Sequence, residues 1–209
     1  MASSRNAPVL ITGAAGTFAS LACRELAAHG RRVICAVRDP DKTRAQPGKL
    51  PTENASVEYV ALELSDLASV RQCTASLRSR VESGELDRLG VVVCSAAIQQ
   101  IKGTPTVTAA GHETTFAVNH VAHFALLAGL LPIMAANGVV IVIGSDAHRN
   151  DYSAPAPSQP STDRAGFFSE RPGYRRLDSV LKVEPGSDPA AKARDFGLQR
   201  CACANAWSD

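Results

Sequence analysis

The 209-residue chain has little net charge and few aromatic residues. Its 22 lysines and arginines are nearly balanced by 20 aspartates and glutamates, which leaves a formal net charge of +2, and aromatic residues make up only 5% of the chain. Proteins that bind nucleic acids present a concentrated basic surface, often interleaved with aromatic side chains. The sequence contains no such cluster, so we expect no nucleic-acid partner.

Targeting and membrane-spanning segments are also missing from the sequence pattern. Residues 1–6 are too short for a signal or transit peptide ahead of the first apolar run. The most apolar stretch, 121–136, carries His123 and Pro132, and we interpret it as a buried helix rather than a membrane span. We therefore expect a cytoplasmic protein, with a plastid as the alternative location.

The six cysteines form no metal-binding or disulfide pattern. Cys201 and Cys203 make one C-x-C pair without a second pair, so we expect no metal site. The other four lie in apolar segments, which is typical of buried free thiols in a reducing compartment. These four are Cys23, Cys35, Cys73 and Cys94.

What the sequence does contain is an alternation of short apolar runs with helix-like segments, over a length that suits one domain. The apolar runs predict strands over 8–12, 32–37, 57–62, 89–94 and 138–144. The helix-like segments lie at 16–29, 66–81 and 114–131. Nearly unbroken hydrophobic strands with helices between them predict a parallel sheet covered on both faces. The predicted fold class is α/β, with a doubly wound, Rossmann-like parallel sheet.

The character of the chain changes after the fifth predicted strand. Six of the twelve prolines lie in 151–209. Proline fixes the backbone and removes a hydrogen-bond donor, so this stretch is not expected to form long regular elements. We predict a Rossmann-like domain over 1–150, followed by an irregular loop and tail over 151–209.

The segment 10–20 joins the first predicted strand to the first predicted helix. Its small residues Gly13, Ala15 and Gly16 let the backbone approach a diphosphate, and the helix that follows presents N–H groups and a positive dipole end. An ordinary strand–helix turn with small residues for packing is the alternative. The segment resembles the Thr-Gly-x-x-x-Gly-x-Gly turn of the short-chain dehydrogenase/reductase family, with Thr17 and Ala19 in place of the later glycines. This resemblance implies that the turn, with Thr17 and Phe18 opening the helix, binds a nicotinamide cofactor.

Arg38 follows the second predicted strand, where an acidic residue would accept bonds from a ribose 2′-hydroxyl. An arginine fork suits a 2′-phosphate instead, so we predict NADP(H) as the cofactor. A surface charge that pairs with Asp39 or Asp41 is the alternative. The Arg-Asp sequence also resembles the protochlorophyllide reductase and retinol dehydrogenase branch of the family.

Two further segments resemble cofactor-binding elements of the family. By this resemblance Glu63 and Leu64, after the third predicted strand, would flank the adenine, while Asp66 is more simply a helix N-cap. After the fourth predicted strand the family has Asn-Asn-Ala-Gly, where this chain has a cysteine followed by small residues that let a cofactor lie close. The residues that would contact the cofactor there are Ser95, Ala96 and Ala97.

The segment 108–127 closely resembles the same branch of the family. The resemblance places Asn119 on the family's catalytic asparagine, which holds a water in a proton relay, and implies that a homodimer would form through this helix. His120 and His123 are three residues apart, so they could share a helix face. We favour packed, hydrogen-bonded histidines over a metal pair, because no third ligand has suitable spacing.

Ser145 ends the fifth predicted strand, at the edge where ligands gather in open α/β sheets. By resemblance it would hydrogen-bond the carbonyl of a small-molecule substrate. The family's proton donor is a tyrosine with a lysine four residues later. In this chain Tyr152 and Tyr174 have no lysine at that spacing, and Lys182 is eight residues beyond Tyr174, about 12 Å along an ideal helix.

These features predict an NADP-dependent short-chain oxidoreductase that reduces a carbonyl or a double bond by hydride transfer. We predict that its activity is impaired, because the Tyr-x-x-x-Lys element is absent. A non-catalytic nucleotide-binding or scaffold protein derived from the family is the alternative, and a working reductase with an unusual proton donor is a third possibility. The resemblance covers about residues 7–150, so the predicted sheet is incomplete on its C-terminal side.

Overall fold

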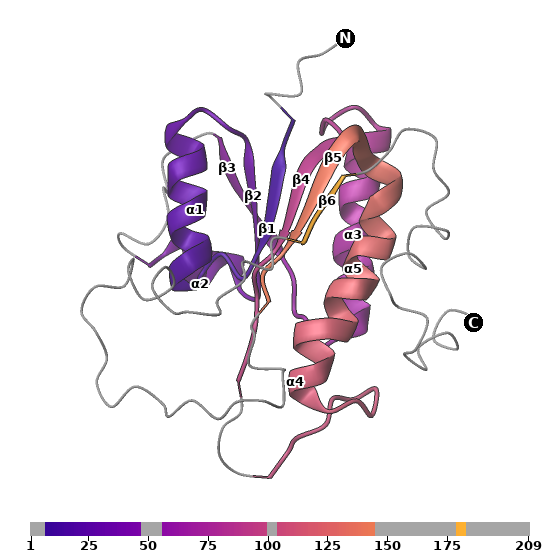
Figure 1. Cartoon of the computed structure of the whole chain (residues 1–209). Helices are drawn as coiled ribbons and strands as arrows, with labels where there is room; N and C mark the ends of the chain where they lie inside the picture. Colours follow the sequence, from indigo (N-terminus) through magenta and orange to yellow (C-terminus); the bar gives the residue numbers. More distant parts are fainter. Residues whose placement is uncertain (1–6, 47–55, 100–103, 145–178, 183–209) are drawn as a thin grey trace.

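A six-stranded sheet forms the centre of the computed structural model, which describes residues 7–46, 56–99, 104–144 and 179–182 (Figure 1). The strands are β1 (Val9–Thr12), β2 (Val33–Val37), β3 (Val57–Ala61), β4 (Leu89–Cys94), β5 (Met134–Val142) and β6 (Ser179–Lys182). Their order is β3-β2-β1-β4-β5-β6. The first five strands pair in parallel, which confirms the predicted doubly wound sheet, and β6 pairs antiparallel with β5.

Helices cover both faces of the sheet (Figure 1). One face carries α1 (Thr17–Ala28), and the other carries α3 (Leu67–Glu82) and α5 (Ala122–Leu130). The side chains of β1 alternate between two cores: Val9 and Ile11 pack with the α1 side, and Leu10 packs with the α3 and α5 side. Since β1 and β2 are covered on both faces, every residue in them is buried.

The short helix α2 (Pro40–Arg44) was not predicted from the sequence. Asp39 caps it by accepting a hydrogen bond from the backbone N–H of Lys42 at 2.9 Å, and Pro40 occupies its first turn. Proline at this position lacks a donor that would have no helical partner in any case. Asp39 and Pro40 therefore determine the start of α2, shortly after the end of β2.

The predicted helix over 114–131 is a succession of segments rather than one regular helix. It begins as α4 (Thr114–Phe116), widens into a π-helical turn, η2 (Ala117–Val121), continues as α5 and ends in the 3₁₀ turn η3 (Leu131–Ile133). Glu113 caps its start through bonds from two backbone N–H groups. A π-helical turn inside an α-helix is a frequent mark of a functional position.

The span Thr114–Ile133 is long and apolar enough to cross a membrane by length and composition, and it alone passes that test among the described residues. In the structure α5 packs on α3, with Leu126 and Leu130 fully buried in the larger core. This is the position of a core helix. The remaining part of the predicted 151–209 tail, apart from β6, lies outside the described residues.

Candidate functional site

A cavity of about 410 Å³ lies at the carboxyl ends of the parallel strands. We call it the strand-end cavity. Its lining comes from the β1–α1 turn, the β2–α2 connection with α2, the segment after β3, the segment after β4 and the π-helical turn. The lining residues are Gly13, Ala15, Gly16, Ala36, Val37, Arg38, Asp39, Lys42, Thr43, Gln46, Leu62, Glu63, Leu64, Ser95, Ala96, Ala97, Ile98 and Val118. Ligands of open α/β sheets bind at this edge.

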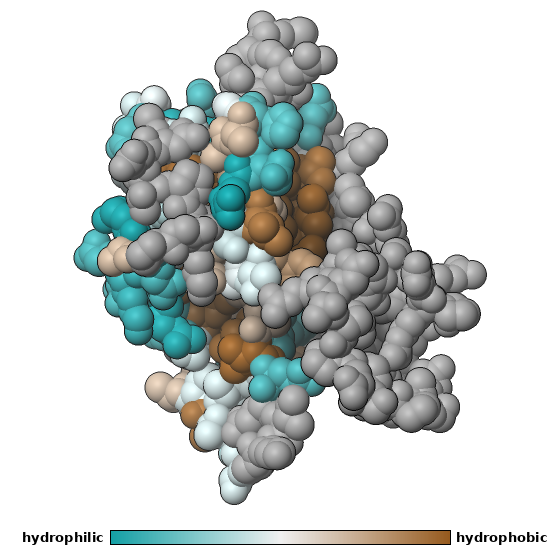
Figure 2. All heavy atoms as spheres, turned by 90° about the vertical axis from the view of Figure 1, so that its left-hand side faces the viewer, coloured by the Kyte–Doolittle hydropathy of each residue, from teal (hydrophilic) through white to brown (hydrophobic). Residues whose placement is uncertain are grey.

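Most of the residues predicted to contact a cofactor line this cavity. They are Gly13, Ala15, Gly16, Arg38, Glu63, Leu64, Ser95, Ala96 and Ala97. Thr17 and Phe18 do not belong to the lining: Thr17 is exposed, and Phe18 is 65% exposed on α1. The face of the molecule on the side of α1 shows hydrophobic side chains among hydrophilic ones (Figure 2). Thr17 and Phe18 therefore remain predictions without support from the geometry of the cavity.

Gly13 brings the β1–α1 turn into close contact with the segment after β4. Its φ is +68°, a left-handed conformation that favours glycine, and an added Cβ would lie 2.8 Å from Cα of Ala96. The N–H of Gly13 donates to the carbonyl of Ala36 at 3.0 Å, and the N–H of Gly16 donates to the carbonyl of Gly13 at 2.8 Å. These bonds tie the turn to the end of β2 and close it on itself, while the contact with Ala96 brings it against the segment after β4.

The N-terminus of α1 opens beside the cavity without a side-chain cap. Gly16 is its N-cap residue, and the first turn contains no acidic side chain. The positive end of the helix dipole is therefore not neutralised by the helix itself. An uncapped helix N-terminus beside a cavity that is lined by small residues favours an anionic ligand such as a diphosphate.

Arg38 forms an ion pair with Glu63, since its Nε lies 2.7 Å from Oε2 of the carboxylate. This partner differs from the two that the sequence suggested. Asp39 caps α2 instead, and Asp41 pairs with Arg44 at 3.1 Å. The Arg38 side chain is 75% exposed and lines the cavity, so its position allows contact with a ligand phosphate.

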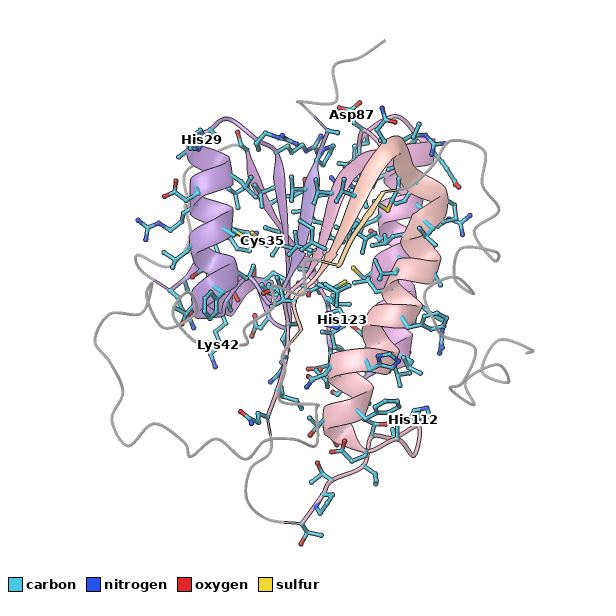
Figure 3. The ribbon with its side chains drawn as sticks, viewed as in Figure 1. His29, Cys35, Lys42, Asp87, His112 and His123 are labelled. Carbon is cyan, nitrogen blue, oxygen red and sulfur yellow. The ribbon has the colours of Figure 1, made fainter. Side chains whose placement is uncertain are left out.

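Lys42 is a second cationic residue of the cavity, and the sequence interpretation missed it. It lies on α2 beside the carboxyl ends of the strands (Figure 3). The signal was present in the sequence: Asp39 and Pro40 predict a helix start, and a helix from there places Lys42 one turn beyond Arg38. Arg38 and Lys42 together give this end of the cavity two positive side chains.

Thr12, the last residue of β1, ties the segment after β4 to the sheet. Its hydroxyl oxygen accepts hydrogen bonds from the backbone N–H groups of Ser95 and Ala96, both at 3.0 Å. The same hydroxyl oxygen lies 3.0 Å from Nε2 of His123, and the hydroxyl donates to the backbone carbonyl of Val93 at 3.5 Å. Nδ1 of His123 lies 3.4 Å from the backbone carbonyl oxygen of Asn119.

Burial lowers the pKa of His123 below its ordinary value of 6.5. The bond to the Asn119 carbonyl opposes this shift and the nearby His120 adds to it. His123 is 5% exposed, whereas His120 is exposed and stacks on Phe116 with ring centroids 5.2 Å apart (Figure 3 labels His123). The two histidines thus have different surroundings, and no group of three potential metal ligands occurs in the described part of the chain.

Asn119 lies in the π-helical turn and clips it to the segment after β4. Its Oδ1 accepts from the N–H of Ile98 at 2.8 Å, and its Nδ2 donates to the carbonyl of the same residue at 2.8 Å. Both polar groups of the amide are engaged, so the side chain fixes the position of a cavity-lining segment. The predicted relay role of Asn119 remains a prediction, and Ser145, Tyr152 and Tyr174 lie outside the described residues.

Comparison with known proteins agrees with this architecture. Residues 7–157 match the short chain dehydrogenase family. Protochlorophyllide reductase B from Oryza sativa is 31% identical over 197 residues, which cover 90% of this chain and 47% of that protein. The human WW domain-containing oxidoreductase is 32% identical over 145 residues, covering 68% of this chain and 33% of that protein. The chain thus spans about half the length, or less, of these relatives.

A solved structure gives the same result. A metagenomic short-chain oxidoreductase in complex with NADP is 27% identical and superposes with a TM-score of 0.53, covering 68% of this chain and 64% of that one. The family match over 7–157 covers the five parallel strands and the glycine turn at Gly13. The chain belongs to the short-chain dehydrogenase/reductase family of oxidoreductases, and its Rossmann-like sheet is the family's nucleotide-binding fold.

Proposed function

We propose that the strand-end cavity binds NADP(H) and that the chain is an NADP-dependent short-chain oxidoreductase with impaired hydride transfer. The observation that carries the proposal is the close approach at Gly13. Together with the uncapped N-terminus of α1, it leaves a space that suits a diphosphate. The metagenomic relative that superposes on this chain has NADP bound, which supports the same cofactor here.

The proposed preference for NADP(H) over NAD(H) rests on Arg38 and Lys42. Both line the end of the cavity beyond β2, where a Rossmann-like sheet receives the adenosine ribose. An arginine fork can make two parallel bonds to a phosphate, and a lysine adds a point charge. Leu64 is 7% exposed and offers an apolar surface beside them for the adenine.

NADPH supplies a hydride when it is bound, and the residues of this chain would orient it. The backbone after β4 comes close enough to let the nicotinamide half lie along it, because Ser95, Ala96 and Ala97 have small side chains. Asn119 holds that segment through Ile98. Reduction of a carbonyl also needs a proton donor. The proposal of impaired turnover rests on Tyr152 and Tyr174, neither of which has a lysine four residues later.

A non-catalytic nucleotide-binding or scaffold protein is the second candidate. The observation that favours it concerns Asn119, whose side-chain amide forms both of its hydrogen bonds with the backbone of Ile98. This contact fixes the position of a cavity-lining segment and does not require a catalytic role for Asn119. Both candidate functions require that the chain binds the cofactor. Only the oxidoreductase would also oxidise NADPH in the presence of a substrate.

A binding titration followed by a turnover assay tests the proposal. NADPH fluorescence should rise to saturation on addition of the full chain, and NADPH oxidation with simple aldehydes and ketones should be slow but measurable. Binding with no turnover for any substrate offered would favour the scaffold candidate. Absence of binding would contradict the proposed function altogether.

A further inference from the structure

We propose that Glu63 sets how strongly the cavity discriminates between dinucleotides with a ribose 2′-phosphate and those with a 2′-hydroxyl. It does so by holding Arg38 in an ion pair that a 2′-phosphate has to break or share. The inference rests on the proposed NADP(H) function and adds a specificity-determining residue to it. The starting observation is the 2.7 Å contact between Arg38 Nε and Glu63 Oε2.

The backbone brings the two side chains together independently of any ligand. Arg38 follows β2 and Glu63 follows β3, and these strands pair in parallel up to Val37 and Ala61. The N–H of Leu62 then donates to the carbonyl of Val37 at 2.8 Å, so the pairing continues into the two connections. The two side chains therefore leave adjacent strand ends on the same edge of the sheet.

Glu63 is the fixed partner of this pair. Its second carboxylate oxygen, Oε1, accepts bonds from the backbone N–H and the hydroxyl of Ser65, both at 2.8 Å. Its own N–H donates to the hydroxyl of Ser69 at 2.9 Å. Its side chain is only 30% exposed. The carboxylate is thus held in place by its own segment, whether or not Arg38 is present.

Arg38 is the partner with freedom to move. Its side chain is 75% exposed, and its contact with Glu63 uses Nε, so within the described residues its terminal nitrogens are left for a ligand. A surface ion pair of this kind contributes little to stability. The pair therefore matters less for folding than for where the guanidinium points.

The charges at this end of the cavity balance. Arg38 and Lys42 contribute two positive charges, and Asp39 and Glu63 contribute two negative ones, and all four residues line the cavity. Asp39 is occupied as the N-cap of α2. A 2′-phosphate must therefore enter a formally neutral site and compete with Glu63 for the guanidinium, whereas a 2′-hydroxyl meets no such competition.

The test measures two affinities of the full chain by calorimetry, with NADP⁺ and NAD⁺ as the probes. For Glu63→Gln we expect the affinity ratio of NADP⁺ to NAD⁺ to rise about fivefold, the scale of one surface ion pair. Asp41→Asn is the matched control. It removes a negative charge from the exposed side of α2, where Asp41 pairs with Arg44 outside the cavity lining, and should leave the ratio unchanged.

A double-mutant cycle shows whether Glu63 acts through Arg38. In an Arg38→Ala background, Glu63→Gln should change the ratio by less than about twofold, because the contact it removes is already gone. An unchanged or lower ratio for Glu63→Gln, with both dinucleotides still bound, would overturn the inference and leave the proposed function intact. If the unmodified chain binds neither dinucleotide, the proposed function fails and this inference fails with it.

Discussion

The hydroxyl oxygen of Thr12 forms a 3.0 Å hydrogen bond with Nε2 of His123 and accepts the N–H groups of Ser95 and Ala96. One buried hydroxyl thus joins the end of β1, the cavity-lining segment after β4 and the start of α5. Because His123 also approaches the Asn119 carbonyl, this cluster connects the sheet to the π-helical turn. We expect the cluster to determine the shape of the cavity as much as the residues that line it.

Replacing Thr12 tests this cluster. Thr12→Val keeps the shape of the side chain but leaves three polar groups without their partner. Since an unsatisfied buried polar group costs about 1–3 kcal/mol, we expect the free energy of unfolding to fall by at least that amount. Urea denaturation measures it. Thr12→Ser retains the hydroxyl and should lose much less, and equal losses for the two variants would show that the hydrogen bonds are unimportant.

His123 should make stability depend on pH. Burial lowers its pKa in the folded state, whereas in the unfolded chain the pKa is near the ordinary value of 6.5. The unfolded state therefore binds more protons just below that pH, so the free energy of unfolding should decrease as pH falls through about 6.5 and continue to fall until the folded histidine is protonated.

Thermal melts between pH 8 and pH 5, roughly the range in which an ordinary histidine titrates, measure this effect. His123→Gln removes the titrating group and should flatten the curve over that interval. The exposed His29 at the end of α1, on the other face of the sheet, provides the matched control, since His29→Gln leaves the surroundings of His123 unchanged and should leave the slope in place. A slope that survives in His123→Gln would assign the effect to another group.

Gly13 should tolerate no side chain. A Cβ there would be strained by the φ of +68° and would collide with Ala96 at 2.8 Å. We expect Gly13→Ala to lower the free energy of unfolding by about 2–4 kcal/mol, from the combined strain and overpacking, and to reduce NADPH binding strongly.

Gly30 offers a matched control for this prediction. Its φ is +71°, but an added Cβ would meet nothing within 4 Å. Gly30→Ala should therefore show only the strain of a left-handed residue, about 1 kcal/mol, and should bind NADPH as the unmodified chain does. If the two variants lost the same free energy of unfolding and both still bound NADPH, the close approach at Gly13 would not matter for cofactor binding.

Two buried cysteines should be inert in the folded protein. Burial raises the pKa of Cys73 to about 11 and that of Cys94 to about 12, so almost no reactive thiolate exists at neutral pH. Iodoacetamide at pH 7.5 should leave both unmodified in native protein and label both in urea, as peptide mass spectrometry would show. Rapid native labelling of Cys94 would mean that the core beneath the cavity opens easily.

The sequence predicted the parallel sheet and the turn at Gly13, because both follow from local patterns. Buried strands read as unbroken apolar runs, and a tight strand–helix turn requires small residues. The partner of Arg38 could not be predicted in the same way. Glu63 is distant along the chain and comes close only through the pairing of β2 with β3, whereas Asp39 and Asp41 were near in sequence.

The cluster around His123 was only partly predictable. Three-residue spacing with His120 suggested a shared helix face, but the π-helical turn beside them alters the helical phase, and the two side chains have different surroundings. Lys42 was missed because the cap and proline of a five-residue helix are easily taken for a loop. In both cases the decisive feature was a local departure from regular helix geometry.

Calorimetric titration of the full chain with NADP⁺ tests the central claim, that the strand-end cavity is a dinucleotide site, most directly. We predict saturable binding of one NADP⁺ per chain, with binding abolished or greatly weakened in Gly13→Ala and preserved in Gly30→Ala. No saturable binding to the unmodified chain, or equal binding to Gly13→Ala, would contradict it.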